Sequence, residues 1–507
     1  MPTNGSHSPE QGPAQATEGR TAPAEYTQAF MQGNALQAVA RFTEAIACYD
    51  RAILLKPGYM EAHRNRANAL KQLGRLAEAI TSYDHAIALK PTVASYTNRG
   101  NVLRELRRTE EALESYERAI ALNPRFAELH NNRGSALQEL GRFEEAAASY
   151  QRAIALKPEY AEGHNNLGVA LHELRRPGEA IAAFDRAIAL KGDYAEALWN
   201  RSLSRLLTGQ YASGWRDYEA RKKKRAPVAD RTYSSPLWLG EEMISGKTIL
   251  VHWEQGFGDT IQFSRYVTLL ADAGARVLFA PQRPLQRLMH TLDPRVQIVD
   301  IDGPLPAFDF HCPLMSLPLA LATEARIPRA EGYLQVDPEK ASAWRGVLGE
   351  KTRPFIGVAW SGSPAQRNNR ARSIEFRSLA ALFDDRYRFF SLQKDVSDQD
   401  RPWLQASGIV HLGDRLEDFA DTAAVCSLMD LVVSVDTSPA HLAGALGIPA
   451  YVLLSYVPDW RWMLDRADSP WYSSVTLFRQ PRRGDWDAAL RQVKLELASR
   501  FPAWRGR

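Results

Sequence analysis

The sequence is poor in three features that would narrow its function: cysteine, an excess of charge of one sign, and long apolar runs. Its three cysteines, Cys48, Cys312 and Cys426, are far apart and odd in number, which argues against a disulfide framework or a cysteine-based zinc site. The formal net charge is +4 over 507 residues, with both signs interspersed, so we expect no nucleic-acid partner. No apolar run approaches the roughly 20 residues that span a bilayer, so we expect no transmembrane segment.

The beginning of the chain also lacks the apolar core of a signal peptide. The first 22 residues are rich in Ser, Gly, Pro, Thr and Gln. We predict a disordered tail over residues 1–24. Because the cysteines require no oxidising compartment, we expect a cytoplasmic location.

What the sequence does contain is a repeat of about 34 residues. Small residues share one position of this repeat: Gly33, Ala67, Gly100, Gly134, Gly168 and Ser202. Aromatic residues share a second position: Tyr49, Tyr83, Tyr116, Tyr150, Phe184 and Tyr218. The repeat length, the small residues where two helices touch and the aromatic residue of the second helix resemble tetratricopeptide repeats. We count six over residues 25–227, an α-helical solenoid of the kind that presents a concave binding surface.

The first helix of each repeat carries a further pattern that the fold does not require. Five repeats have asparagine two positions before the small residue, nearly opposite the packed face: Asn65, Asn98, Asn132, Asn166 and Asn200. Asparagine is a mediocre helix former, and its amide can both donate to and accept from a peptide backbone. We interpret this asparagine column as a peptide-binding ladder, similar to the one that lines the superhelix of the protein O-GlcNAc transferases. The alternative is repeat duplication with solvated side chains.

A different kind of sequence begins after the repeats. The basic run from Arg221 to Arg225 reads as a solvated helix end, and residues 228–246 read as a linker. Strand-helix alternation then predicts two doubly wound, Rossmann-like α/β domains, at residues 247–346 and 347–507, that face a common cleft. A helix is expected from Thr260 to Ala273 and another over 486–499. Strands are expected at residues 248–253, 276–280, 297–301, 308–312, 354–360, 387–392, 409–412, 430–435 and 450–454.

Neither a nicotinamide cofactor nor a metal is expected. The loop that begins at Gly256 and Gly258 has Ile261 where a dinucleotide fingerprint needs its third glycine. The Asp300-Ile301-Asp302 pattern has the spacing of a metal-binding pair, but acidic patterns this short arise by chance. We therefore expect no cofactor.

Three short motifs carry a resemblance to a known family. Gly258-Asp259 follows the first strand, Val-Ala-Trp-Ser-Gly-Ser over 358–363 opens the second domain, and Asp-Thr-Ser-Pro-Ala-His over 436–441 begins a helix. Over roughly residues 247–507 the chain thereby resembles a bacterial heptosyltransferase-like glycosyltransferase of the GT-B fold. With the repeats in front, the overall layout is similar to that of protein O-GlcNAc transferases. The resemblance implies an inverting, metal-independent transfer with Asp259 as the catalytic base.

The chemistry of the same residues points the same way. Sugar transfer from a nucleoside diphosphate needs a base for the acceptor and compensation of the negative charge left on the diphosphate. A strand end followed by hydroxyls, a proline and free backbone N–H groups at a helix start suits a diphosphate. The residues expected to bind the nucleotide sugar are Ser361, Gly362, Arg372, Lys394, Asp436, Thr437, Ser438 and His441.

Each of these assignments has a structural alternative. Asp436 would repel phosphate, so we expect it to hold a sugar or ribose hydroxyl or to cap the helix. Arg372 and Lys394 could be ordinary surface charges. Asp259 could be the N-cap of the helix from Thr260, in which case His252 or Glu254 is the fallback base. Glu254 is the stronger of the two, since His252 falls within the buried first strand.

The sequence therefore predicts a glycosyltransferase that moves a sugar from a nucleoside-diphosphate sugar to a protein or peptide held by the repeats. Two alternatives remain open: a non-catalytic adaptor with a degenerate transferase part, and an enzyme acting on a surface glycan. The asparagine column serves the first two models equally, whereas Asp259 and the segment 436–441 matter to an enzyme alone.

Overall fold

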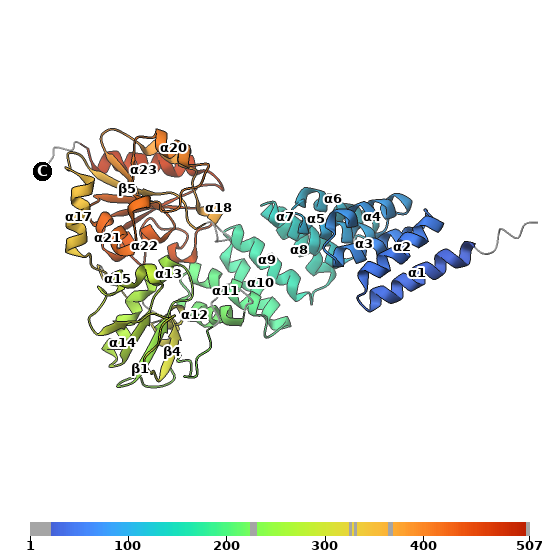
Figure 1. Cartoon of the computed structure of the whole chain (residues 1–507), viewed down its shortest axis with the longest axis horizontal. Coiled ribbons are helices and arrows are strands. Elements are labelled where there is room, and N and C mark those ends of the chain that lie inside the picture. The colour runs from blue at the N-terminus through green and yellow to red at the C-terminus, as the bar shows by residue number, and fades with distance from the viewer. Residues whose placement is uncertain (1–21, 224–230, 324–326, 329–331, 364–368, 503–507) are drawn as a thin grey trace, which may run out of the picture. The chain divides into compact units, whose positions relative to one another are not determined.

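The computed structural model describes residues 22–223, 231–323, 327–328, 332–363 and 369–502 (Figure 1). It divides into two compact units, residues 1–170 and 171–507. The predicted tail over 1–24 lies outside the described residues up to residue 21, and helix α1 begins at Ala22. Within the described part, no helix is long and apolar enough to cross a membrane.

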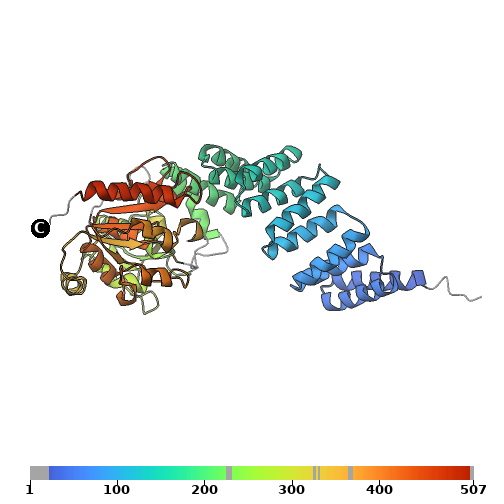
Figure 2. The same ribbon diagram turned by 90° about the horizontal axis from the view of Figure 1, so that it is seen from above.

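Successive helix pairs make up the first part of the chain, and Figure 2 shows them stacked pair after pair in the first unit. The described residues hold six such pairs. Their helices are α1 (Ala22–Ala38), α2 (Phe42–Leu55), α3 (Met60–Gln72), α4 (Leu76–Leu89), α5 (Val93–Glu105), α6 (Thr109–Leu122), α7 (Ala127–Glu139), α8 (Phe143–Leu156), α9 (Ala161–Glu173), α10 (Pro177–Leu190), α11 (Ala195–Leu207) and α12 (Tyr211–Tyr218). The first unit ends inside α9.

The two helices of a pair meet where the small residue of the first faces the aromatic residue of the second. A Cβ atom added to Gly100 or Gly134 would lie 2.7 Å from the ring of Tyr116 or Tyr150, respectively. These rings are almost fully buried and cannot move aside. Gly100 and Gly134 therefore leave no room for a side chain at this contact, in agreement with the small residues that the repeat pattern predicted where two helices touch.

An arginine next to the asparagine column ties neighbouring second helices together. Arg99 donates from Nε to Asp84 in α4 and from Nη1 to Ser115 in α6, at 2.6 and 2.7 Å. Arg66, Arg133 and Arg201 make corresponding bonds in their own repeats. This column was not predicted from the sequence, because each partner lies about half a repeat away.

The second unit contains two parallel sheets. The first has the order β3-β2-β1-β4, with strands β1 (Thr248–His252), β2 (Arg276–Ala280), β3 (Val296–Ile298) and β4 (Phe310–Pro313). The second has the order β10-β9-β8-β5-β6-β7, with strands β5 (Phe355–Ala359), β6 (Arg388–Ser391), β7 (Val410–His411), β8 (Leu431–Val435), β9 (Ala450–Leu454) and β10 (Val475–Arg479). Helix α23 (Trp486–Arg500) covers one face of this sheet (Figure 2).

Both orders reverse direction at the first strand of their sheet, as doubly wound sheets do. These switch points lie between β1 and β4 and between β5 and β8. Ligands of such sheets bind outside the carboxyl ends of the strands at the switch point. The topology thus predicts that a ligand would bind at the loops after β1, β5 and β8.

Three details differ from the sequence-based expectation. Strand β10 was not predicted. Helix α13 (Phe257–Phe263) begins before Thr260, and a 3₁₀ turn at Ser264–Tyr266 separates it from α14 (Val267–Asp272). Helix α17 (Pro338–Leu348) crosses the expected boundary between residues 346 and 347 and packs on α21 (Phe419–Ser427).

The sixth repeat is built into the α/β part of the second unit. Leu206, Trp215 and Tyr218 belong to the same buried apolar cluster as Ile249 and Val251 of β1. On the face that packs against β1, this repeat therefore shares its apolar core with the first sheet.

Replacing Gly134 by alanine tests the helix-pair contact. The added methyl group would overlap the buried ring of Tyr150, and overpacking of this kind costs about 1 to 3 kcal/mol. We expect urea unfolding of the repeats at correspondingly lower denaturant. Gly178→Ala in α10 is the matched control, because nothing lies within 4 Å of its added Cβ and alanine favours a helix. Equal stability of the two variants would contradict this account.

Candidate functional site

Three of the predicted motifs follow strands at the switch points. Gly258 and Asp259 come after β1, Ser361 and Gly362 after β5, and the segment 436–441 after β8. The first motif opens α13 and the last opens α22 (Ser438–Ala445). Helices α13 and α22 pack against each other, so the structure brings together the motifs that follow β1 of the first sheet and β8 of the second (Figure 1).

The closest approach joins Gly258 to His441. A Cβ added to Gly258 would lie 2.8 Å from His441 Cδ2, so a side chain there would push the two helices apart. His441 is buried, lies with Nδ1 3.0 Å from the hydroxyl of Tyr472 and stacks on Trp462 at a ring distance of 5.2 Å. Its Nε2 lies 3.7 Å from Asp436 Oδ1. His441 therefore connects α22 to α13.

Asp436 carries a negative charge in this setting. Burial opposes charging of its carboxyl, but the hydrogen bond and charge of His441, with help from Trp462 and Arg372, lower the pKa of Asp436 below its ordinary value. An ionised carboxylate repels phosphate and accepts hydrogen bonds from hydroxyls. This agrees with the expected role on a sugar or ribose hydroxyl.

The helix start after Asp436 offers fewer backbone donors than the sequence suggested. Thr437 is the N-cap of α22, and its side chain makes no capping hydrogen bond. The Ala440 N–H donates to the Thr437 carbonyl at 2.9 Å, and Pro439 has no N–H. The amides that α22 leaves without an intrahelical partner here are therefore those of Thr437 and Ser438.

Arg372 joins the same group of residues. It ends helix α18 (Asn369–Arg372) and donates from Nη1 to the carbonyl of Asp436 at 3.0 Å. Its guanidinium lies so close over Gly362 that a Cβ there would overlap it. Beside it, the Ser361 amide donates to Gln393 Oε1 at 3.1 Å. Ser361, Gly362, Arg372 and Asp436 thus meet at the carboxyl edge of the second sheet.

Lys394 points elsewhere. It is exposed after β6, and its Nζ donates to the carbonyl of Leu416. Among the described residues, its contact is with the loop before α21 and not with Arg372 or Asp436.

Asp259 has two partners, one local and one distant. As the third residue of α13, it accepts at Oδ2 from the Gly256 N–H at 2.8 Å, which explains why the helix begins at Phe257. It accepts at Oδ1 from Nη2 of Arg461, whose side chain is 7% exposed. The side chain of Asp259 stays 19% exposed, and a carboxylate has lone pairs beyond these two bonds. Asp259 therefore caps its helix, although not as the N-cap, and still reaches the surface.

Arg461 was missed by the sequence analysis. It lies in a 3₁₀ turn, η7 (Trp460–Trp462), after β9. Its Nε donates to Gln262 Oε1 at 2.7 Å and its Nη1 to Asp459 Oδ1 at 2.8 Å. Burial opposes its charge, but Asp459 and Asp259 raise the pKa of Arg461 above its ordinary value. The Trp-Arg-Trp triplet predicts burial of this segment, but it contains no pattern from which Asp259 could have been predicted as the partner of Arg461.

The fallback bases are engaged in other contacts. Glu254 accepts from Nε and Nη2 of Arg221 at 2.5 and 2.9 Å, and both side chains are 1% exposed. The expectation of a solvated Arg221 is therefore wrong, because this guanidinium is needed to neutralise a buried carboxylate. The end of the basic run, residues 224 and 225, lies outside the described residues. His252 is buried against Tyr233 and His311, and burial lowers its pKa to about 3.

The asparagine column links successive repeats. Asn98 Nδ2 donates to Asn68 Oδ1 of the preceding repeat at 3.1 Å, and the Tyr83 hydroxyl donates to the same oxygen at 2.6 Å. Asn65 and Asn166 make equivalent bonds to Asn34 and Asn131. Asn132 is half-buried, and in the described part of the chain it has no such bond. Asn200 is half-buried and also has an interaction partner. Linking repeats is thus a structural role for three of the five amides.

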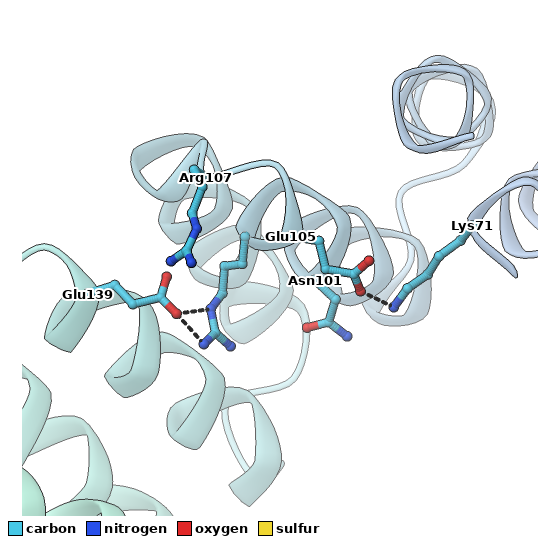
Figure 3. Close-up of a pocket in the computed structure, with 6 residues that line it drawn as sticks. Lys71, Asn101, Glu105, Arg107 and Glu139 are labelled. Carbon is cyan, nitrogen blue, oxygen red and sulfur yellow. Dashed lines mark hydrogen bonds and ion pairs between the residues drawn. The ribbon is translucent and has the colours of Figure 1, made fainter. Parts of the chain in front are cut away.

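A pocket of about 440 Å³ lies in the second to fourth repeats (Figure 3). Two ion pairs cross it: Lys71 Nζ to Glu105 Oε1 at 2.9 Å, and Arg104 Nη2 to Glu139 Oε1 at 2.6 Å. Arg107 and Asn101 complete the lining, so positive charge is in excess. Asn101 stands three residues after Asn98 on one face of α5, and the pocket therefore continues the asparagine column.

Metal ligands do not gather anywhere in the described ranges as a group of three or more His, Cys, Asp or Glu side chains. The charged groups at the meeting of α13 and α22 are instead paired with one another.

Comparison with known proteins identifies the repeats. A family model described as a TPR repeat matches residues 100–141 and 134–174, and two described as a tetratricopeptide repeat match 30–94 and 161–194. Helices α1 to α12 therefore form a tetratricopeptide-repeat solenoid of the protein-interaction kind. Protein FlbA of Caulobacter vibrioides is 25% identical over 323 residues, 58% of this chain and 53% of FlbA. The chain spans about half of FlbA, and the matched part of this chain is longer than its repeats.

Solved structures similar to this chain include two repeat proteins. YrrB, described as a TPR protein with an unusual peptide-binding site, is 24% identical, with a TM-score of 0.34 over 37% of this chain and 100% of YrrB. A tetratricopeptide repeat protein from Parabacteroides merdae is 18% identical, with a TM-score of 0.37 over 41% of this chain and 82% of its own.

The buried His252 predicts an acid-sensitive α/β part. An unfolded chain protonates this imidazole below about pH 6.5, whereas the folded chain does so near pH 3. Stability is therefore lost as pH falls through that window, by about 1.4 kcal/mol per unit. Between pH 7 and 5, urea unfolding should show the wild type losing about 2 kcal/mol more than His252→Gln. The exposed His290→Gln should behave as wild type, and equal losses in all three chains would refute the assignment.

Proposed function

We propose that the α/β part is a GT-B glycosyltransferase and that the repeats bring it a protein or peptide acceptor. The observation that carries this proposal is the meeting of Gly258-Asp259 with the segment 436–441. Each motif lies at the switch point of its own sheet, and they meet where two doubly wound domains pack together. A donor bound there would contact both domains, with its reacting carbon near Asp259.

The donor side has groups suited to a nucleoside diphosphate. The amides of Thr437 and Ser438 follow the end of β8, and the guanidinium of Arg372 contacts the same strand end through the Asp436 carbonyl. These groups would compensate phosphate charge. The ionised Asp436 accepts from a ribose or sugar hydroxyl. Lys394 has a weaker claim because its ammonium is bonded to Leu416.

The transfer step is a single displacement at the anomeric carbon. The acceptor oxygen forms a bond to that carbon while its proton passes to a carboxylate oxygen of Asp259. The bond between that carbon and the diphosphate oxygen breaks, and its electron pair leaves on the diphosphate, near Thr437 and Arg372. Attack from the face opposite the leaving group inverts the anomeric centre.

The repeats provide the acceptor side of the proposal. The amides of the asparagine column have donors and acceptors beyond those used in the inter-repeat hydrogen bonds. These can bind the backbone of an extended peptide. The pocket around Arg104 and Arg107 adds excess positive charge, which favours an acidic side chain nearby. Several weak contacts of this kind raise the effective concentration of the acceptor at the transfer site.

Nucleotide binding is the first test. Calorimetry with uridine, adenosine, guanosine and cytidine diphosphates, with chelator present, should show one of them binding the wild type. Thr437→Ala combined with His441→Ala should weaken that binding at least tenfold, because it removes a hydroxyl at the helix start and the contact of α22 with Gly258. Binding of none would favour a non-catalytic adaptor.

Asn132→Ala tests where the acceptor lies. This amide makes no inter-repeat bond in the described part of the chain, so its loss should leave thermal stability within about 0.5 kcal/mol of wild type. Transfer to a protein acceptor should fall several-fold while donor hydrolysis by water is unchanged. Asn98→Ala is the comparison, since it also breaks the bond to Asn68 and should lower stability as well. Unchanged protein transfer in Asn132→Ala would favour an acceptor outside the repeats, such as a surface glycan.

A further inference from the structure

The 3₁₀ turn η7 joins the sixth repeat to the transfer site through three consecutive residues. Trp460 packs edge to face on Trp215 of α12, with ring centres 5.2 Å apart, and lies 6.3 Å from the ring of Tyr218. Arg461 bonds Asp259. Trp462 stacks on His441. One turn therefore touches the repeat, the candidate base and the helix of the donor side.

Each of the three nitrogens of the Arg461 guanidinium donates a hydrogen bond in this region. Nε is bonded to Gln262 and Nη1 to Asp459, which leaves Nη2 directed at Asp259. Gln262 and Asp259 are one helical turn apart on α13. The guanidinium therefore bonds α13 at Asp259 and at Gln262, and its planar geometry fixes the distance between these two side chains.

The turn itself is held rigidly on its far side. Arg479 at the end of β10 donates to the carbonyls of Trp462, Met463 and Arg466 at 2.7, 2.9 and 3.2 Å. The Arg461 N–H donates to Asp459 Oδ1 at 3.0 Å, which caps the turn. Because these bonds hold the turn in one shape, a displacement of Trp460 would carry Arg461 along with it.

We propose that Arg461 is the positioning residue of Asp259 and that the sixth repeat sets its place through Trp215 and Trp460. This inference rests on the proposed function and adds that the last repeat is part of the transfer site and not a spacer before it. Trp215 and Trp460 are 3% and 4% exposed, so the contact is a permanent part of the core. The sixth repeat thereby acts on the base through one buried aromatic contact and one guanidinium.

The test measures release of nucleoside diphosphate from nucleotide sugars carrying the four nucleosides above, with water as the acceptor. At saturating donor, Arg461→Gln should lower kcat about tenfold to a hundredfold with the KM for the donor changed less than threefold, because the base is misplaced while donor binding persists. Arg461→Lys keeps the charge and should recover part of the loss. Arg466→Gln, in the same loop but paired with Asp468, should match the wild type.

A double-mutant cycle separates positioning from general damage. If Arg461 acts through Asp259, then Arg461→Gln should have no further effect in an Asp259→Asn background. Trp215→Leu should lower kcat in the wild-type background and leave the residual rate of Asp259→Asn unchanged. Phe184→Leu in the fifth repeat removes an equally buried ring that lies outside the apolar cluster of Trp215 and Trp460, and should lower stability without this loss of kcat.

The outcomes distinguish the two proposals. A wild type that binds no nucleotide and releases no diphosphate overturns the proposed function, and the positioning role with it. An active wild type in which Arg461→Gln equals Arg466→Gln, or in which its effect multiplies with that of Asp259→Asn, overturns the positioning role alone. An active wild type with Trp215→Leu equal to Phe184→Leu overturns the part assigned to the sixth repeat.

Discussion

Burial of the sixth repeat in the core of the first sheet is the interaction on which the rest of the second unit depends. Apolar side chains of α11 and α12 share one cluster with β1, and removing that surface from water is the main gain. The ion pair of Arg221 and Glu254 lies at the same junction, where each charge would be costly alone. Trp460 completes the cluster, and the position of η7 follows from it.

Arginine and asparagine side chains link the helices of neighbouring repeats in two different ways. The arginine column ties second helices together, and three amides of the asparagine column join first helices. In both columns the half-buried polar side chains provide one another's hydrogen-bond partners. In the proposed function these amides also bind the acceptor, so stability and recognition would draw on one set of residues.

Local patterns made much of the fold predictable. The repeats, the small residues where two helices touch and all strands except β10 were predicted from patterns of residues near one another in sequence. The start of α13 was misplaced because Asp259 caps Gly256 from within the helix. The partners of Asp259 and Glu254 could not be predicted, since Arg461 lies far along the chain and Arg221 stands in a basic run typical of a surface. Long-range pairing of charged side chains leaves no periodic trace in a sequence.

The unequal embedding of the repeats has a consequence for how such a chain can change over time. The first four repeats, formed by α1 to α8, make contacts with their neighbours in the stack. One of these repeats could therefore be gained or lost without disturbing any residue near Asp259. The sixth unit has no such freedom, because its aromatic rings are also the packing partners of the strands. The number of leading repeats can thus vary, whereas the sixth repeat is not interchangeable with them.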